Sequence, residues 1–446
     1  MLDHENLMAM YTLFTHPKKG RPKGVCYGLT SKYLDALFCN DRLTLYKRLA
    51  LIEKYQDRPE QLLHNIQRLY DTNKKFAGQK EFTPDEQVLL EVRPFFESLI
   101  LQLHPFYFPE IFDGEVVQNY VLNHSVASPI RLEKSAPKLL HRSYHAKTKK
   151  ELIQYVKSLE RALTTSAQRI GFIIESDEHA VALNYNPEKD TWEWLNSDEL
   201  MQSDIGDYHQ ELSTIELVET LQNTLSPPDE TSIEEPYIPS KYTVFIISCI
   251  GLNNEPSLQR DLELLSPHPF SKKVLSRVNN DNISMFFLAA QSGDIDAVTA
   301  MLPFIDDIDE ERYDGETALS MAVREGHLSV VKLLIENSAD KKHTNEFGRT
   351  LLHNAAAMGH TEIIDYLLTL ESAVDEEDDN GQTALIKAIL QNQYQTVLSL
   401  IEHHANVNLL NKEDGITPIF YAAIVDDPDM IRALMDAGAN IGYTHL

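Results

Sequence analysis

The C-terminal third of the chain repeats itself, and this limits the possible folds more than any other sequence feature. Four segments align, among them "DGETALSMAVREGHLSVVKLLI" and "FGRTLLHNAAAMGHTEIIDYLL". Their turn glycines are Gly315, Gly348, Gly381 and Gly415, so the steps are 33, 33 and 34 residues. A unit of this length cannot bury its hydrophobic face alone, so the sequence predicts that the units stack into a solenoid.

The residues after each glycine match the ankyrin pattern. Thr317, Thr350, Thr383 and Thr417 stand where a threonine opens the first helix of an ankyrin repeat. A degenerate unit, "ISMFFLAAQSGDIDAVTAMLPFI", precedes them and is expected to cap the array. Residues 283–446 therefore resemble an all-α ankyrin-repeat solenoid, with one degenerate cap and four repeats.

Ankyrin repeats resemble one another in having no chemistry of their own, so the resemblance implies binding of a protein on the concave face and hairpin tips. The tip residues expected to bind a partner are Phe347, Arg349, Asn380, Gln382, Asp414 and Ile416. The acidic run "DEEDD" at 375–379 is either a solvated loop or a contact for a basic partner. Asn408 resembles the asparagine that asparaginyl hydroxylases modify, although such a residue also makes structural hydrogen bonds.

Charge and composition exclude several classes of function. Residues 281–446 carry 9 Lys and Arg against 29 Asp and Glu, a net charge of −20, so direct nucleic-acid binding is not expected there. We expect the basic stretch "HPKKGRPKG" at 16–24 to be a solvated loop, or a segment whose positive charge attracts an acidic substrate toward Cys26. We find no signal-peptide pattern, and the apolar run at 244–252 is too short to span a membrane.

Cysteine usage indicates a reducing environment. Cys26, Cys39 and Cys249 are too few for a disulfide framework, and their spacing does not suggest zinc. We therefore expect no metal and no cofactor, and we expect Cys39 and Cys249 to be structural. His104, His141 and His145 are expected in helical or loop segments without partners.

The first 262 residues read as helices followed by strands. Apolar periodicity predicts helices near 29–39, 43–55, 60–73, 84–103 and 149–168. Strands are predicted at 169–175, 179–185, 191–195 and 242–250, with an exposed insertion at 223–240. This order predicts an α+β domain over 1–262. Residues 263–282 are either a linker or a docking helix.

Cys26 raises a question of chemistry, since in "GVCYGLTSKYL" it stands where a helix begins. The helix dipole and free amides there favour a thiolate. His179 opens a strand and Asn196 follows the next one, which is the order of a papain-like site. The two segments resemble the YopT-type bacterial cysteine proteases. The resemblance implies that Cys26 attacks a carbonyl, His179 accepts its proton, and the Cys26 amide helps to hold the oxyanion.

The third catalytic position departs from that family, because "LNSD" stands where its aspartate turn would be. Asn196 can orient an imidazole, and Asp198 is the competing residue. The alternatives are an inert cysteine with a structural histidine, or an acyltransferase site. Peptide or isopeptide hydrolysis is the leading interpretation.

A papain-like half followed by a short acidic ankyrin array resembles the Legionella ankyrin-repeat effectors. The resemblance implies export by a type IV secretion system and action in the cytosol or nucleus of a host cell. We expect a monomer in which the ankyrin array binds a host protein and presents it to the Cys26 site. The alternative is a non-catalytic scaffold that occupies the host protein with its hairpin loops.

Overall fold

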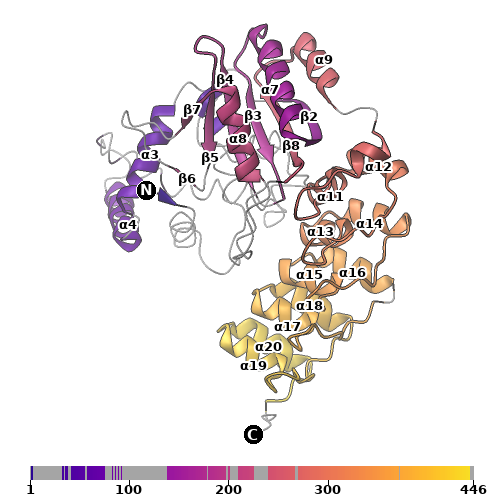
Figure 1. Cartoon of the computed structure of the whole chain (residues 1–446). Coiled ribbons are helices and arrows are strands. Elements are labelled where there is room, and N and C mark those ends of the chain that lie inside the picture. Colours follow the sequence, from indigo (N-terminus) through magenta and orange to yellow (C-terminus); the bar gives the residue numbers. More distant parts are fainter. Residues whose placement is uncertain are drawn as a thin grey trace, which may run out of the picture. The chain divides into compact units, whose positions relative to one another are not determined.

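The computed structural model describes two compact units, and each is treated by itself. The described residues are 2–3, 33–34, 36–38, 42–55, 58–75, 83, 86, 89, 92, 138–177, 179–196, 199–200, 209–225, 240–266, 270–370 and 372–441. Described residues up to Asn280 form one unit and those from Asp281 onward form the other. We call these the sheet unit and the repeat unit (Figure 1).

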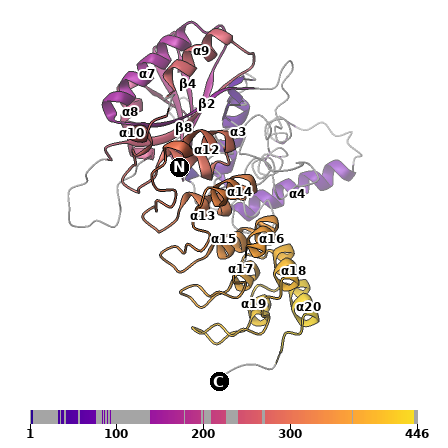
Figure 2. The same cartoon turned by 90° about the vertical axis from the view of Figure 1, so that its right-hand side faces the viewer.

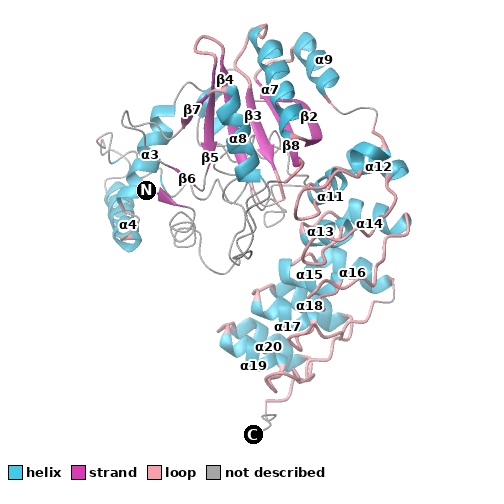
Figure 3. Cartoon of the chain, viewed as in Figure 1, coloured by secondary structure: helices cyan, strands magenta, loops and turns pink. Residues whose placement is uncertain are grey.

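A six-stranded antiparallel sheet organises the sheet unit (Figure 3). Its strands in spatial order are β2 (Lys138–Lys147), β8 (Thr243–Gly251), β3 (Gly171–Glu175), β4 (Ala180–Asn186), β5 (Thr191–Asn196) and β7 (Gln210–Leu212). A separate two-stranded sheet pairs β1 (Leu2–Asp3) with β6 (Glu199–Leu200). The described part of this unit thus combines an antiparallel sheet with helices, while the narrower papain-like assignment stays a prediction.

Helices α7 (Lys149–Thr164), α8 (Thr214–Leu225) and α9 (Pro256–Leu265) cover one face of the sheet (Figure 2). The start of α7 is fixed by Thr148, whose hydroxyl accepts a hydrogen bond from the Glu151 amide while Glu151 reaches back to the Thr148 amide. Phe172, Leu183 and Trp192 alternate with residues of the opposite face and are buried beneath these helices. We call this cluster the α7 core.

The opposite face carries a second hydrophobic cluster, the α3 core. It joins helical residues at 33–34 and 36–38 with α3 (Arg42–Lys54) and α4 (Pro59–Lys75). Their partners on the sheet include Ile173, Ala182 and Leu195. Gly171 permits this contact, since a Cβ there would lie 2.6 Å from Leu34 Cδ2. Both faces of the sheet are therefore covered, which explains why its central strands are almost wholly apolar.

The chain beyond β8 packs against the sheet unit before the repeats begin. Helix α9 is followed by the short helix α10 (Lys272–Leu275). Arg277 then donates to the Ala146 carbonyl at 2.9 Å and to both carboxylate oxygens of Glu151 at 3.1 and 3.2 Å. Its guanidinium also lies 5.1 Å from the Tyr242 ring centroid. The described residues at 256–266 and 270–277 are therefore structured.

The repeat unit consists of helix pairs joined by hairpins that project to one side of the stack (Figure 2). The threonines predicted to open the first helices are N-cap residues, and the Thr317 hydroxyl accepts a hydrogen bond from the Ser320 amide at 3.2 Å. The helices are α11 (Met285–Gln291), α12 (Ile295–Met301), α13 (Ala318–Arg324), α14 (Leu328–Glu336), α15 (Leu351–Met358), α16 (Thr361–Thr369), α17 (Ala384–Leu390), α18 (Tyr394–Glu402), α19 (Pro418–Ile424) and α20 (Pro428–Asp436).

Most predicted elements that fall on described residues are present. Sequence patterns missed β2, α8 and α9 as well as the short strands β1, β6 and β7. They also placed His141 and His145 in helix or loop. That placement is wrong, because both histidines lie in β2. In the part of the chain that the structure describes, no helix is long and apolar enough to cross a membrane.

Candidate functional site

His179 lies at the turn that joins β3 to β4. The Ser176 amide donates to the His179 carbonyl at 2.8 Å, and the His179 amide donates to Ser176 Oγ at 3.2 Å. The backbone bond continues the β3–β4 pairing by one residue pair, and the side chain of Ser176 accepts the second bond. His179 therefore extends the alternation of β4 and shares a side of the sheet with Val181. As a residue, His179 is half-buried.

Asn196, the last residue of β5, lies opposite Val181 in the sheet. Directly opposed residues project to the same face, so Asn196 shares the α7 side with Val181. His179 and Asn196 thus occupy the same end and the same side of neighbouring strands. Cys26 and Asp198, the other two predicted catalytic residues, lie outside the described residues, as do Cys39 and His104.

Polar side chains on β2 are the feature of this unit that sequence reasoning missed. His145 is fully buried, its Nε2 lies 2.9 Å from Ser143 Oγ, and its ring centroid is 4.5 Å from that of Tyr155. His141 Nε2 lies 2.7 Å from Ser266 Oγ. The expectation that these histidines lack partners is wrong. Polar residues interrupt the apolar pattern of β2, so no local signal in the sequence marks this segment as a strand.

Glu175 is a buried carboxylate at the same end of the sheet as His179. Burial raises the pKa of Glu175, and the Arg142 guanidinium, 3.4 Å away, opposes that shift. Glu175 pairs with Ala180 across the β3–β4 hairpin, and Ala180 belongs to the α3 core. The Glu175 side chain therefore projects to the side of the sheet opposite to that of His179.

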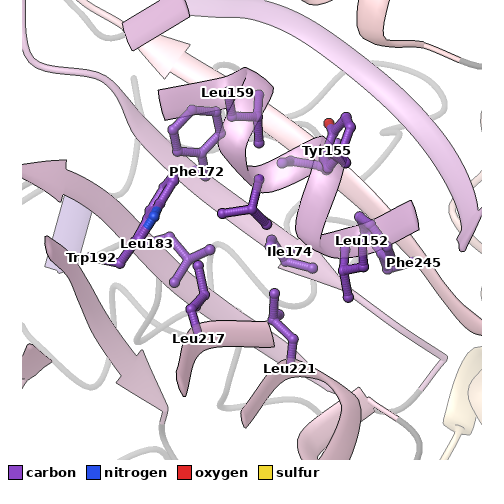
Figure 4. Close-up of a pocket in the computed structure, with 12 residues that line it drawn as sticks. Leu152, Tyr155, Leu159, Phe172, Ile174, Leu183, Trp192, Leu217, Leu221 and Phe245 are labelled. Atoms are coloured by element: carbon purple, nitrogen blue, oxygen red, sulfur yellow. The ribbon is translucent and has the colours of Figure 1, made fainter. Parts of the chain in front are cut away.

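An apolar pocket lies between the sheet and helices α7 and α8 (Figure 4). Leu159, Phe172, Leu183, Trp192 and Leu217 are among its walls, and every wall residue is aliphatic or aromatic. The void measures about 10 Å³, which is at the lower limit for one water molecule. It is a packing seam of the α7 core and has no room for a substrate. Cys249 is buried in the same core, and burial raises the pKa of its thiol, as expected of a structural cysteine.

In the repeat unit, the hairpin tips are joined to one another by backbone hydrogen bonds. The Tyr313 amide donates to the Asp281 carbonyl at 3.3 Å, Glu346 to Asp314 at 3.3 Å, and Asp379 to Phe347 at 3.1 Å. We call the tips at 312–316, 345–349, 378–382 and 411–416 the hairpin edge. Backbone bonds thus join the first three tips, and the fourth tip is joined to the third by Asn411, whose Nδ2 donates to the Asn380 carbonyl at 3.1 Å. The edge is therefore a continuous row rather than a set of independent loops.

Buried polar groups support the row from beneath. Glu316 accepts hydrogen bonds from Asn345 at 2.7 Å and from Asn354 at 3.2 Å. One step further along the row, Asp378 is fully buried and forms an ion pair with Lys387 at 2.7 Å. Burial alone would raise the pKa of Asp378, but hydrogen bonds from Lys387 and from the Gln382 amide outweigh it and lower the pKa. The carboxylate is therefore charged at neutral pH and holds its tip to the helix below.

Comparison with known families agrees with this geometry. The family model for ankyrin repeats matches residues 262–345, 286–376, 334–411 and 369–445.

The C-terminal region of the chain consists of ankyrin repeats.

Known proteins that resemble the chain are matched over short stretches. An ankyrin repeat and KH domain-containing protein of Caenorhabditis briggsae is 30% identical over 187 residues, 39% of this chain and 7% of that protein. The mitochondrial liver isoform of glutaminase from Rattus norvegicus and that from Mus musculus are each 32% identical over 91 residues, 20% of this chain and 14% of the enzyme. The chain thus spans less than a sixth of the length of these relatives, and the similarity carries none of their activities to it.

The six predicted partner-binding residues all lie on the ankyrin hairpin edge. Three are exposed and three are half-buried: Phe347, Asn380 and Asp414 in the first group, and Arg349, Gln382 and Ile416 in the second. Their role in binding stays a prediction.

Asn408 lies in the loop after α18, away from the hairpin tips. Its Nδ2 donates to the Gly438 carbonyl at 3.0 Å, and its Oδ1 accepts from the Asn440 amide at 2.7 Å. Both side-chain polar atoms are thus engaged with the following loop, which supports the structural interpretation of this asparagine. Its hydroxylation stays a prediction. Among the described residues, no group of three His, Cys, Asp or Glu side chains could hold a metal ion.

Proposed function

We propose that the chain captures another protein along the hairpin edge of its ankyrin repeats. Protein binding is the role that ankyrin repeats suggest, and the residues that do it are the finer part of the proposal. The observation that best supports this proposal is the position of exposed Phe347 and half-buried Arg349 on a row of tips that backbone hydrogen bonds fix in place. A surface that is already rigid loses little conformational entropy when a partner binds.

The test compares two matched double variants of the full chain in affinity purification from cells. Phe347→Ala with Arg349→Ala removes the edge side chains. Ile424→Ala with Arg432→Ala removes an exposed apolar residue and an exposed cation away from the edge. We expect the first pair to lose partners that the wild type and the second pair retain, as judged by quantitative mass spectrometry. Equal recovery by both pairs would refute the proposal.

A second candidate function is thiol-dependent hydrolysis in the sheet unit. It is supported by the position of His179 and Asn196 at one end and one side of neighbouring strands. The Cys26 sulfur would attack the carbonyl carbon of a peptide or isopeptide bond, and its proton would pass through His179 to the leaving amine. Water would then hydrolyse the thioester. Asn196 or Asp198 would orient the imidazole.

The residues at 33–34 and 36–38, which follow Cys26 in the chain, pack in the α3 core, on the side of the sheet opposite to His179. This candidate therefore requires Cys26 to reach the end of the sheet where His179 lies. An electrophilic thiol probe tests it directly. We expect labelling of Cys26 in the wild type, strongly reduced labelling in His179→Ala, and unchanged labelling in a His64→Ala control, in which the histidine is exposed on α4. Equal labelling in all three proteins would leave only the scaffold function.

The cellular setting stays a prediction from the resemblance to Legionella effectors. A reporter fused to the chain would enter host cells in a type IV-dependent manner if the prediction holds. Loss of the host-cell effect in Cys26→Ala would favour the hydrolase, whereas its loss only in the edge variants would favour a scaffold.

A further inference from the structure

The hairpin edge changes its chemistry along its length. Its first two tips expose aromatic rings, since Tyr313 is 60% exposed and Phe347 is 49% exposed. The last two tips expose polar and acidic groups, including Asp379 and Glu413. Exposed apolar side chains that lie on neighbouring loops often mark a site of interaction with another molecule.

Both rings are held in place by an arginine of their own tip. The Arg312 guanidinium lies 4.8 Å from the Tyr313 ring centroid and is itself paired with Asp314 at 2.6 Å. The Arg349 guanidinium lies 5.3 Å from the Phe347 ring centroid. These cation–π contacts limit the motion of each ring and leave another part of it exposed. Fixed aromatic side chains are the residue type that most often dominates binding energy at protein interfaces.

The charged groups of the hairpin edge that remain without an ion pair among the described residues are carboxylates. Its cations are engaged, because Arg312 pairs with Asp314, Arg349 lies 3.8 Å from Asp378, and Lys412 pairs with Glu377 at 2.5 Å. In contrast, an exposed carboxylate with no ion pair among the described residues occurs on or beside each of the last three tips. These carboxylates are Glu346, Glu376, Asp379 and Glu413.

We propose that the hairpin edge binds an extended segment of another protein that joins one or two large hydrophobic residues to a cluster of lysines or arginines. The hydrophobic residues pack on Tyr313 and Phe347, and the basic residues lie beside Glu346, Asp379 and Glu413. The segment is extended because the tips that recognise it form a row. This inference rests on the proposed use of the edge for protein binding and adds the chemistry of the partner.

Selection from a random dodecapeptide library on the immobilised full chain tests the inference. We expect enriched peptides to combine a Phe, Leu, Trp or Tyr with several Lys or Arg. A synthetic copy of an enriched peptide should bind about tenfold more weakly to Tyr313→Ser with Phe347→Ser, as expected for the loss of central aromatic contacts. It should also bind about tenfold more weakly to Asp379→Asn with Glu413→Gln, and weaken further as salt is raised.

Matched controls place the same chemical changes elsewhere on the repeats. Ile424→Ser with Met435→Ser removes exposed apolar residues, and Glu402→Gln with Asp436→Asn removes exposed carboxylates. Both should bind the peptide as the wild type does.

The outcomes separate the inference from the proposal on which it rests. Peptides that need Tyr313 and Phe347 but carry no excess of basic residues would overturn the partner chemistry and keep the edge as the binding surface. Peptides that bind the edge variants as well as the wild type, or a selection with no enrichment, would overturn both.

Discussion

The two units bury hydrophobic surface over different distances along the chain. In the sheet unit, edge strand β2 pairs with β8, so that Lys138 lies opposite Gly251. In the repeat unit, contacts join residues about one repeat apart, as between the Asp379 amide and the Phe347 carbonyl. Long-range pairing makes every strand depend on the whole sheet, whereas stacked repeats are stabilised mainly by their neighbours. The comparison teaches that damage should spread through the first unit and stay local in the second.

The largest effect is expected from Phe172→Ala in β3. Phe172 is fully buried in the α7 core, with its ring centroid 6.0 Å from that of Trp192. Removing a buried Phe costs about 3–5 kcal/mol. Hydrogen exchange should show lost protection across all strands of the sheet, with the helices at 318–436 protected as before.

Leu264→Ala is the control, because this leucine is 78% exposed on α9 and its loss should leave exchange unchanged. If Phe172→Ala exposed only β3, or if the repeats lost protection equally, the proposed difference between the units would be wrong.

The same difference explains what the sequence could predict. The repeats could be read from Gly315, Gly348 and the threonines after them, because each local pattern is seen four times. Strand β2 could not, because its partner β8 begins 96 residues after β2 ends and its polar residues His141, Ser143 and His145 mask the apolar pattern. The burial of Asp378 and Lys387 could not be predicted either, since charged residues usually lie on the surface and nothing in the sequence links these two positions.

The next prediction concerns this buried pair. Lys387→Met removes the cation that pairs with the buried Asp378 carboxylate at 2.7 Å and leaves only Arg349, 3.8 Å away. Removing one partner of a buried ion pair costs about 3–5 kcal/mol. Chemical denaturation of the full chain, followed by exchange at 345–402, measures the loss. Other repeats of the chain show which uncharged residues can replace the pair. Met321 occupies the position of Lys387 in the first repeat, and Asn345 and Asn411 occupy the position of Asp378.

Lys387→Met combined with Asp378→Asn should therefore recover most of the stability, since the asparagine keeps an acceptor for the Asn380 and Gln382 amides and carries no charge. A double variant as unstable as the single one would show that the ion pair is not the cause.

Acid should weaken the repeat unit through His327. Burial lowers the pKa of His327 to about 4, although its hydrogen bond with the Gln291 carbonyl, 2.9 Å long, opposes the shift. An unfolded histidine has a pKa near 6.5, so the unfolded state takes up the proton first as the pH falls. The contribution to stability is complete above about pH 6.5 and is lost as the pH falls to about 4, by about 3 kcal/mol.

His360 bonds to the Arg324 carbonyl in the same way, and burial lowers its pKa to about 4. As a residue it is half-buried where His327 is buried, so its effect should be smaller. Gln393 takes the matching position in the next repeat. His327→Gln with His360→Gln should therefore flatten the stability profile between pH 6.5 and 4, apart from the loss due to carboxylates such as Asp378. An unchanged profile in this variant would rule out the histidines as the cause.

The smallest expected effect compares two turn glycines with nearly the same backbone. Gly315 and Gly415 have φ of +75° and +70°, so an alanine at either position is strained by about 1–2 kcal/mol. They differ in their surroundings, because a Cβ on Gly315 would lie 2.7 Å from the Glu346 amide nitrogen, whereas a Cβ on Gly415 meets no atom within 4 Å. Gly315→Ala must therefore also push apart two bonded tips of the hairpin edge.

We expect Gly315→Ala to be the more destabilising variant in chemical denaturation. It should also weaken peptide binding at the edge, while Gly415→Ala leaves binding intact. Equal losses of stability would mean that the turn conformation alone requires glycine, and that the bonds between tips add nothing to the row.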